Sequence, residues 1–344
     1  MMVTVARGGR RLPRPVIALA TALAVLGLTA GCAGGEPAAD PRPVTTSSSP
    51  AEPVRAPLRG TVIAAGEAEN PSLAVKIDNH ERARPQIGLN TTDLVFEELV
   101  EGGYTRYAAI WQSTVPDEVG PVRSIRPMDP DILSPLGGVV AYSGGQQQFV
   151  ALMQAAPVQN LIFDRDQTHF FRDTSRRAPH NVVLRAADAL ADYAEVPAPA
   201  PQFAYASDPG GSTASVAGVP SARIAMTFSH IRYPSWDWDA ATGTYLRHQE
   251  DAPDLDSEGQ RIATVNVVAL KVPVELGDVP RTVLSGSGEG WFSANGHTVQ
   301  GIWSKDGRDD PLRFTDSSGS SVLLAPGNTW IELVPAETGT IVTG

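Results

Sequence analysis

Residues 93–111 read DLVFEELVEGGYTRYAAIW, and this stretch sets the fold class of the region around it. Two apolar runs rich in strand-forming residues flank Gly102 and Gly103. Adjacent glycines can supply the positive φ angles that a tight hairpin turn needs. The segment therefore predicts an antiparallel hairpin whose strands lie on either side of the two glycines.

Strands and helices alternate on both sides of this hairpin. SLAVKIDN (72–79) and GGVVAYSGG (137–145) have strand patterns, whereas QQQFVALMQAA (146–156) has the spacing of a helix. The run VVLRAADALADYAEV (182–196) is the clearest helix, because apolar residues recur there at three- and four-residue steps. This alternation predicts an α/β-type N-terminal domain over residues 58–197.

The pattern changes after residue 197. Residues 198–220 are rich in Pro, Gly, Ser and Ala, which is typical of an inter-domain linker. Residues 221–344 contain short alternating runs separated by turn residues and no convincing helix. We therefore expect an α+β protein, with an all-β C-terminal domain that forms a sandwich or a small barrel.

The N-terminus carries an export and anchoring pattern. Four arginines precede an apolar run at 16–28, which is too short to cross a bilayer at roughly 20 residues but suits a signal peptide. LTAGC (28–32) resembles a lipobox. We expect residues 1–31 to be removed as a lipoprotein signal peptide and Cys32 to be acylated, anchoring the protein to the outer face of the cytoplasmic membrane. Residues 32–57 are expected to form a disordered tether.

Charge and cysteine content exclude several classes of protein. The formal charge is −11, and losing the four arginines of residues 1–31 makes the mature chain −15 (−11 − 4). Such an acidic chain is not expected to bind nucleic acid. Cys32 is the single cysteine, so neither disulfides nor thiolate catalysis are expected. We identify no motif for a metal or another cofactor and expect none.

Several motifs together resemble a known family. They are LAVKIDNHERARPQIGL (73–89), VFEELVEGGYTRYAAIW (95–111), GPVRSIRP (120–127), FRDTSRRAPHN (171–181), WDWDAATGTYLR (236–247) and APGNTWIELVP (325–335). In this order, the motifs are similar to those of the YerB-like lipoproteins, over nearly all of residues 70–335. The resemblance implies a lipoprotein signal and an N- and C-terminal domain pair. It implies no reaction, because the family has no assigned function.

Arginines and glycines near strand ends predict an anion pocket. Arginine is a bidentate donor to phosphate and carboxylate, and free N–H groups at a helix start also favour anions. If the loops that carry these residues converge, they form a ligand-binding site. The candidate residues are Arg123, Arg126, Ser143, Gly144, Gly145, Arg172, His180 and Asn181. The alternative is that the arginines pair with nearby carboxylates and the glycines only begin helices.

Carboxylates in the hairpin suggest a second hypothesis. With a two-residue loop, Glu97 and Glu101 share a face with Arg106, and two carboxylates could divide acid and base roles in glycan hydrolysis. Asp78 and His80, which end a strand, could join either site.

The favoured interpretation is a non-catalytic envelope lipoprotein that binds an anionic cell-envelope ligand or a protein partner. The first alternative is a hydrolase of cell-wall glycan or a phosphodiester, with Glu97, Glu101 or His180 as catalytic residues. The second is a structural adaptor whose arginines only hold the two domains together.

Overall fold

The structure is a computed structural model that describes residues 53–344. The predicted signal peptide, Cys32 and most of the predicted tether lie outside the described residues. Among the described helices, none is both long and apolar enough to cross a membrane.

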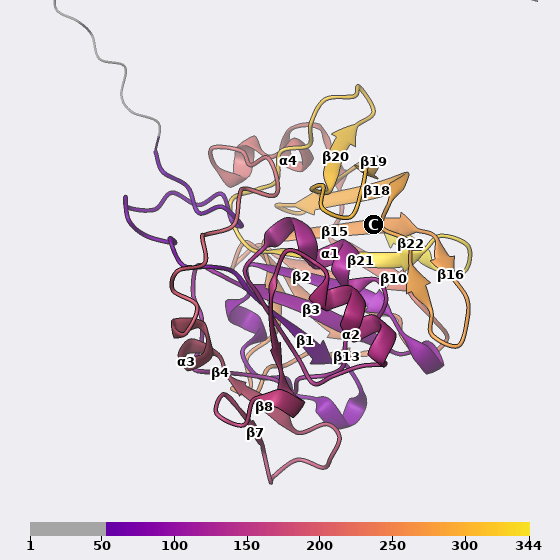
Figure 1. Ribbon diagram of the computed structural model, residues 1–344. Helices are drawn as coiled ribbons and strands as arrows, with labels where there is room; N and C mark the ends of the chain where they lie inside the picture. The colour runs from indigo at the N-terminus through magenta and orange to yellow at the C-terminus, as the bar shows by residue number, and fades with distance from the viewer. Residues whose placement is uncertain (1–52) are drawn as a thin grey trace, which may run out of the picture. The chain divides into compact units, whose positions relative to one another are not determined.

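An eleven-stranded mixed sheet forms the centre of the protein (Figure 1). Its strands, in spatial order, are β20 (Arg313–Asp316), β19 (His297–Lys305), β18 (Gly286–Ala294), β15 (Asn266–Val272), β21 (Thr329–Pro335), β2 (Leu94–Leu99), β3 (Thr105–Trp111), β1 (Leu73–Asp78), β5 (Val139–Tyr142) and β6 (Gln159–Ile162), with β9 (Val219–Pro220) paired to β19. Strands from both predicted domains therefore share one sheet.

The two halves of this sheet meet where β2 pairs with β21. The pairing is parallel and aligns residues 94–98 with residues 329–333. A parallel neighbour cannot be joined by a short turn, so it must come from a distant part of the chain. In this protein it comes from the last tenth of the sequence.

Both faces of the main sheet are covered. Helices α1 (Asp129–Leu133) and α2 (Gln147–Gln154) pack on one face, which Figure 1 shows in front of β1, β2 and β3. Smaller sheets pack on the other face. The first, a six-stranded sheet, consists of β13 (Ala252–Pro253), β12 (Thr244–Gln249), β11 (Ser235–Asp239), β10 (Arg223–Thr227) and β22 (Thr340–Thr343), with β14 (Ala263–Thr264) beside β12. The second is the three-stranded sheet of β4 (Glu118–Val119), β8 (Val182–Arg185) and β7 (Phe170–Arg172). Consequently every residue of β2 and β3 is buried.

The predicted fold class is confirmed. The helices α1, α2 and α3 (Ala186–Ala191) lie within residues 58–197, and the described elements after residue 220 are all strands. Residues 198–220 form the short helix α4 (Thr213–Ala217) and β9, and α4 packs against β18 and β19. A further hairpin joins β16 (Val274–Glu275) to β17 (Arg281–Thr282). The exact domain boundaries stay a prediction.

Two local predictions were wrong. The predicted two-residue loop would pair Leu99 with Arg106. The β2–β3 register instead pairs Glu98 with Arg106, because the loop is longer and contains a 3-10 turn, η3 (Glu101–Gly103). The run 182–196 begins as strand β8 and only then turns into α3. The first residues of this run are β-branched and lie between β4 and β7, so they pair in a sheet although the apolar residues have helical spacing.

Candidate functional site

A cluster of charged and aromatic side chains lies where β1 ends and β3 begins. Asp78, the last residue of β1, is at its centre and is almost fully buried. One carboxylate oxygen, Oδ2, lies 2.7 Å from Nδ1 of His180 and 3.1 Å from Nε of Arg123. Two of the residues predicted from sequence therefore converge on a carboxylate.

Two further arginines join this group. Arg106 is buried and donates to the carbonyl oxygen of Ser124 at 2.6 Å, and Arg126 pairs with Glu101 at 2.7 Å. Burial, and then the positive charges of Arg126 and Arg123, lower the pKa of Arg106 to about 10. We call Arg106, Arg123 and Arg126 the arginine cluster.

Aromatic rings stack beside the arginine cluster. The ring of His80 lies 4.4 Å from that of His180 and 4.9 Å from that of Tyr104, between centroids. The guanidinium of Arg232 lies over the ring of Tyr104, 4.8 Å from its centroid. Burial lowers the pKa of His80, although 28% of its side chain is exposed. The cluster therefore has a ring-lined side that solvent reaches.

The glycine-ended strand β5 supports the arginines. The backbone N–H of Ser143 donates to the carbonyl of Arg123, and the carbonyl of Gly144 accepts from Ile125. Gly144 has a φ of +96°, which favours glycine, and Gly145 follows it. Because the Ser143 amide already has a partner, this segment positions Arg123 and does not offer that amide to a ligand.

Arg172 and Asn181 shape the loop that carries His180. Nη1 of Arg172 donates to Oδ1 of Asn181 at 2.8 Å, while its guanidinium covers the ring of Phe163. Arg176 ties the same loop to the carbonyls of Ala83 and Pro85 at 2.9 and 2.7 Å. These contacts hold His180 against His80.

A buried charged triad lies on the same face of the sheet as Asp78 and Arg106. Nζ of Lys76 contacts both Glu98 and Asp129, and none of the three is exposed. Burial, and then the charge of Asp129, raise the pKa of Glu98 to about 7. The triad is therefore a buried polar group next to the arginine cluster.

The predicted pair of Glu97 and Glu101 does not form. Glu97 points to the opposite face of the sheet, where Oε2 accepts from Arg247 at 2.5 Å. Glu101 instead pairs with Arg126. Strand β2 ends at Leu99 and Glu101 lies in the turn η3, so the two carboxylates do not share a strand face and the predicted arrangement for two-carboxylate glycan hydrolysis is absent.

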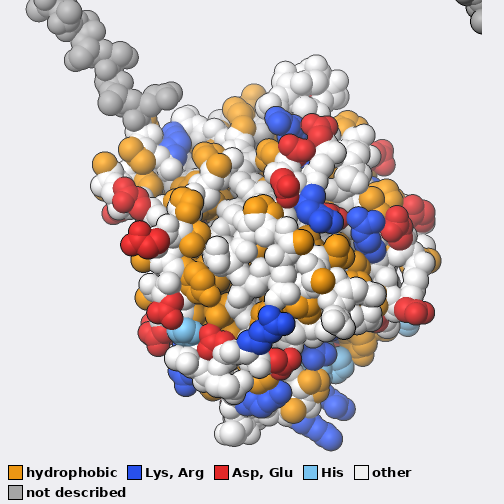
Figure 2. All heavy atoms as spheres, viewed as in Figure 1, with side chains coloured by type: hydrophobic (Ala, Val, Ile, Leu, Met, Phe, Trp, Pro, Cys, Tyr) orange, Lys and Arg blue, Asp and Glu red, His pale blue; other side chains and the backbone are white. Residues whose placement is uncertain are grey.

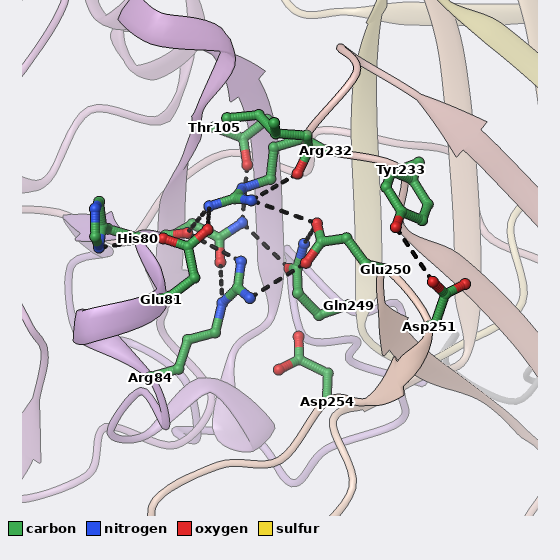
Figure 3. A network of polar contacts seen from close by, with 12 residues as sticks. His80, Glu81, Arg84, Thr105, Arg232, Tyr233, Gln249, Glu250, Asp251 and Asp254 are labelled. Carbon is green, nitrogen blue, oxygen red and sulfur yellow. Dashed lines mark hydrogen bonds and ion pairs between the residues drawn. The ribbon is translucent and has the colours of Figure 1, made fainter.

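Polar contacts join the two predicted domains (Figure 3). Figure 3 shows Arg232 and Arg84 on either side of Glu81 and Glu250. Asn79, the residue after β1, donates to Gln249 of β12 at 3.3 Å. This part of the structure agrees with the adaptor hypothesis, but it uses arginines other than those of the arginine cluster.

Sequence reasoning did not place Tyr104 at the site, and it placed Arg106 in a different cluster. Tyr104 follows the glycine turn, so its position depends on the loop conformation. Arg106 and Asp78 are register partners in the antiparallel pair of β1 and β3. Pairing the two strands in sequence would have brought Arg106 and Asp78 together.

Comparisons with known proteins agree with this architecture. Family models described as "Protein of unknown function (DUF3048)" match residues 59–197 with the N-terminal domain and 224–331 with the C-terminal domain. The chain is 27% identical over 298 residues to "Putative lipoprotein YerB" of Bacillus subtilis (strain 168), covering 83% of this chain and 87% of the relative. It is similar to the crystal structure of the YerB protein from Bacillus subtilis, with a TM-score of 0.73 and 23% identity over 84% of this chain and 99% of the other. The chain therefore belongs to the DUF3048 family of proteins of unknown function.

Proposed function

We propose that this protein is an exported envelope lipoprotein that binds an anionic cell-envelope ligand at the arginine cluster. The observation that carries the proposal is the gathering of three arginines and His180 around Asp78 and Glu101. Burial, and then the charges of Arg126 and Arg123, lower the pKa of Arg106. An anion placed among them would relieve their mutual repulsion and accept charge-assisted hydrogen bonds.

Donors for such a ligand remain free. The only ion pair or hydrogen bond of the Arg123 side chain within residues 53–344 joins Nε to Asp78, so its two terminal nitrogens have no polar partner there. The side chain of Arg123 is 22% exposed, which gives a ligand access. Nε2 of His180 likewise has no hydrogen-bond partner among the described residues. Arg123 and His180 therefore supply the direct contacts in this proposal.

Replacing Arg123 with lysine tests the proposed site. Lysine keeps the charge but loses the two-pronged donor geometry, so phosphate affinity should fall about tenfold, equivalent to about 1.4 kcal/mol. Isothermal titration of inorganic phosphate into the wild type and Arg123→Lys measures this. Arg313→Lys, at an exposed position of β20, is the control and should bind as the wild type does. Equal affinity of Arg123→Lys and wild type for phosphate, or no binding by the wild type, contradicts the proposal.

A phosphodiester hydrolase is the second candidate function, and the Asp78–His180 pair favours it. A carboxylate bonded to Nδ1 fixes an imidazole so that Nε2 can accept or donate a proton. A hydrolase should release product from a phosphodiester, and His180→Gln should abolish this release while Arg123 still binds the phosphodiester. A binding protein should release no product in either form.

Membrane anchoring is tested at Cys32, which lies outside the described residues. Replacing Cys32 with alanine removes the site of acylation, so the protein should move from the membrane fraction to a soluble exported pool. Fractionation and immunoblotting measure this, with Ser48→Ala in the predicted tether as the control. Full retention of the processed Cys32→Ala protein in membranes would show that the anchor is not a lipid on this residue.

A further inference from the structure

Exposed arginines continue outward from the arginine cluster. Arg82, Arg172 and Arg177 are exposed, and none of them forms an ion pair with a carboxylate among residues 53–344. We call them the outer arginines. Figure 2 shows basic side chains gathered at the lower end of this face, where Figure 1 places β7 and β8. An unpaired basic patch is unusual on a chain with a net charge of −11.

Each outer arginine is close to the site through a direct contact. The backbone N–H of Arg82 donates to Nδ1 of His80 at 3.1 Å. The carbonyl of Arg177 accepts from the backbone N–H of His180 at 3.0 Å. Arg172 binds the side chain of Asn181, the neighbour of His180. The backbones of Arg82 and Arg177 therefore lie directly beside the stacked pair of His80 and His180.

The number of donors indicates the type of anion. A carboxylate offers two oxygens, whereas a terminal phosphate offers three that can each accept from a separate donor. The two unpaired terminal nitrogens of Arg123 and Nε2 of His180 give three donor positions, which match a terminal phosphate. Further unpaired arginines outside the site would serve further phosphates of the same molecule.

We infer that the ligand is a linear polymer of phosphate groups, whose terminal phosphate lies in the arginine cluster and whose next phosphates contact the outer arginines. This inference rests on the proposed function and adds the class of ligand to it. Several weak contacts on one chain raise its affinity above that of a single phosphate, because the later contacts form within one complex.

Long-chain polyphosphate and inorganic phosphate are the probes for this inference. The wild type should bind polyphosphate about tenfold more tightly than inorganic phosphate, or more. In the double variant Arg82→Gln/Arg177→Gln, polyphosphate affinity should fall about tenfold, whereas the affinity for inorganic phosphate should stay within about twofold. The slope of log affinity against log salt should decrease by about 0.7 for each arginine removed.

Two controls separate a local contact from a general effect of charge. Arg313→Gln removes one positive charge, as each substitution of the double variant does, but Arg313 lies on β20, at the far edge of the main sheet from β1. It should leave polyphosphate affinity unchanged. Polyglutamate of similar length carries carboxylates in place of phosphates and should bind at least about tenfold more weakly.

The outcomes distinguish the inference from the proposed function. If the wild type binds inorganic phosphate but binds polyphosphate no more tightly, the polymer inference is wrong and the proposed function stands. Equal losses in Arg313→Gln and in the outer-arginine variants, or equal binding of polyglutamate, also overturn the inference. If inorganic phosphate does not bind, the proposed site is wrong. If polyphosphate still binds in that case, and its binding depends on Arg82 and Arg177, only the contact between the polymer and the outer arginines is supported.

Discussion

Arg247→Ala should lower the free energy of unfolding by about 3–5 kcal/mol, because it leaves buried carboxylates without their partner. Arg247 is fully buried and donates to Glu97 and Asp254, each at 2.5 Å. Burial by itself would lower the pKa of Arg247, but the negative charge of Glu97 and of other neighbours raises it well above the usual value. The guanidinium also lies 5.1 Å from the ring centroid of Trp330.

Urea denaturation at neutral pH measures the effect of Arg247→Ala. The control is Arg223→Ala, which removes an exposed ion pair with Asp237 and should cost no more than about 1 kcal/mol. A triple variant, Arg247→Met/Glu97→Gln/Asp254→Asn, removes the charges together and should recover part of the loss. Equal destabilisation by Arg247→Ala and Arg223→Ala would show that the buried ion pairs contribute little.

The charged residues of β2 show why sequence could not identify this cluster. Adjacent glutamates in a strand usually indicate at least one solvent-facing side. Glu97 and Glu98 are both buried, because one faces Arg247 and the other faces Lys76. Their partners come from strands 22 and 150 residues away, a distance that local patterns do not encode.

The arginine cluster was partly predictable for a different reason. Arg123, Arg126 and His180 are each next to a strand end or a turn, and polar side chains at strand ends often gather at one edge of a sheet. The structure brings these three together around Asp78 and Glu101. The hydrogen bond between Arg172 and Asn181 could not be predicted from the sequence, because it depends on the path of the loop between β7 and β8.

A fragment of residues 221–344 should not reach its native fold alone, although its sequence reads as an independent β domain. In the structure β21 lies between β15 and β2, and every residue of β21 is buried. Without β2, the fragment exposes the edge of an apolar central strand and leaves Arg247 without Glu97. Exposed edges of this kind favour aggregation.

Mixing the two halves of the chain should restore the fold, because the missing contacts lie between them. Residues 53–220 supply β2 and Asn79, whereas residues 221–344 supply β21 and Gln249. Near-ultraviolet circular dichroism detects recovery, since Tyr107 of the first half and Trp330 of the second half pack edge to face in the full chain. The full chain cleaved at an inserted protease site near Gly210 is the control and should keep its signal. A native signal and cooperative unfolding from residues 221–344 alone would show that this region folds independently of β2.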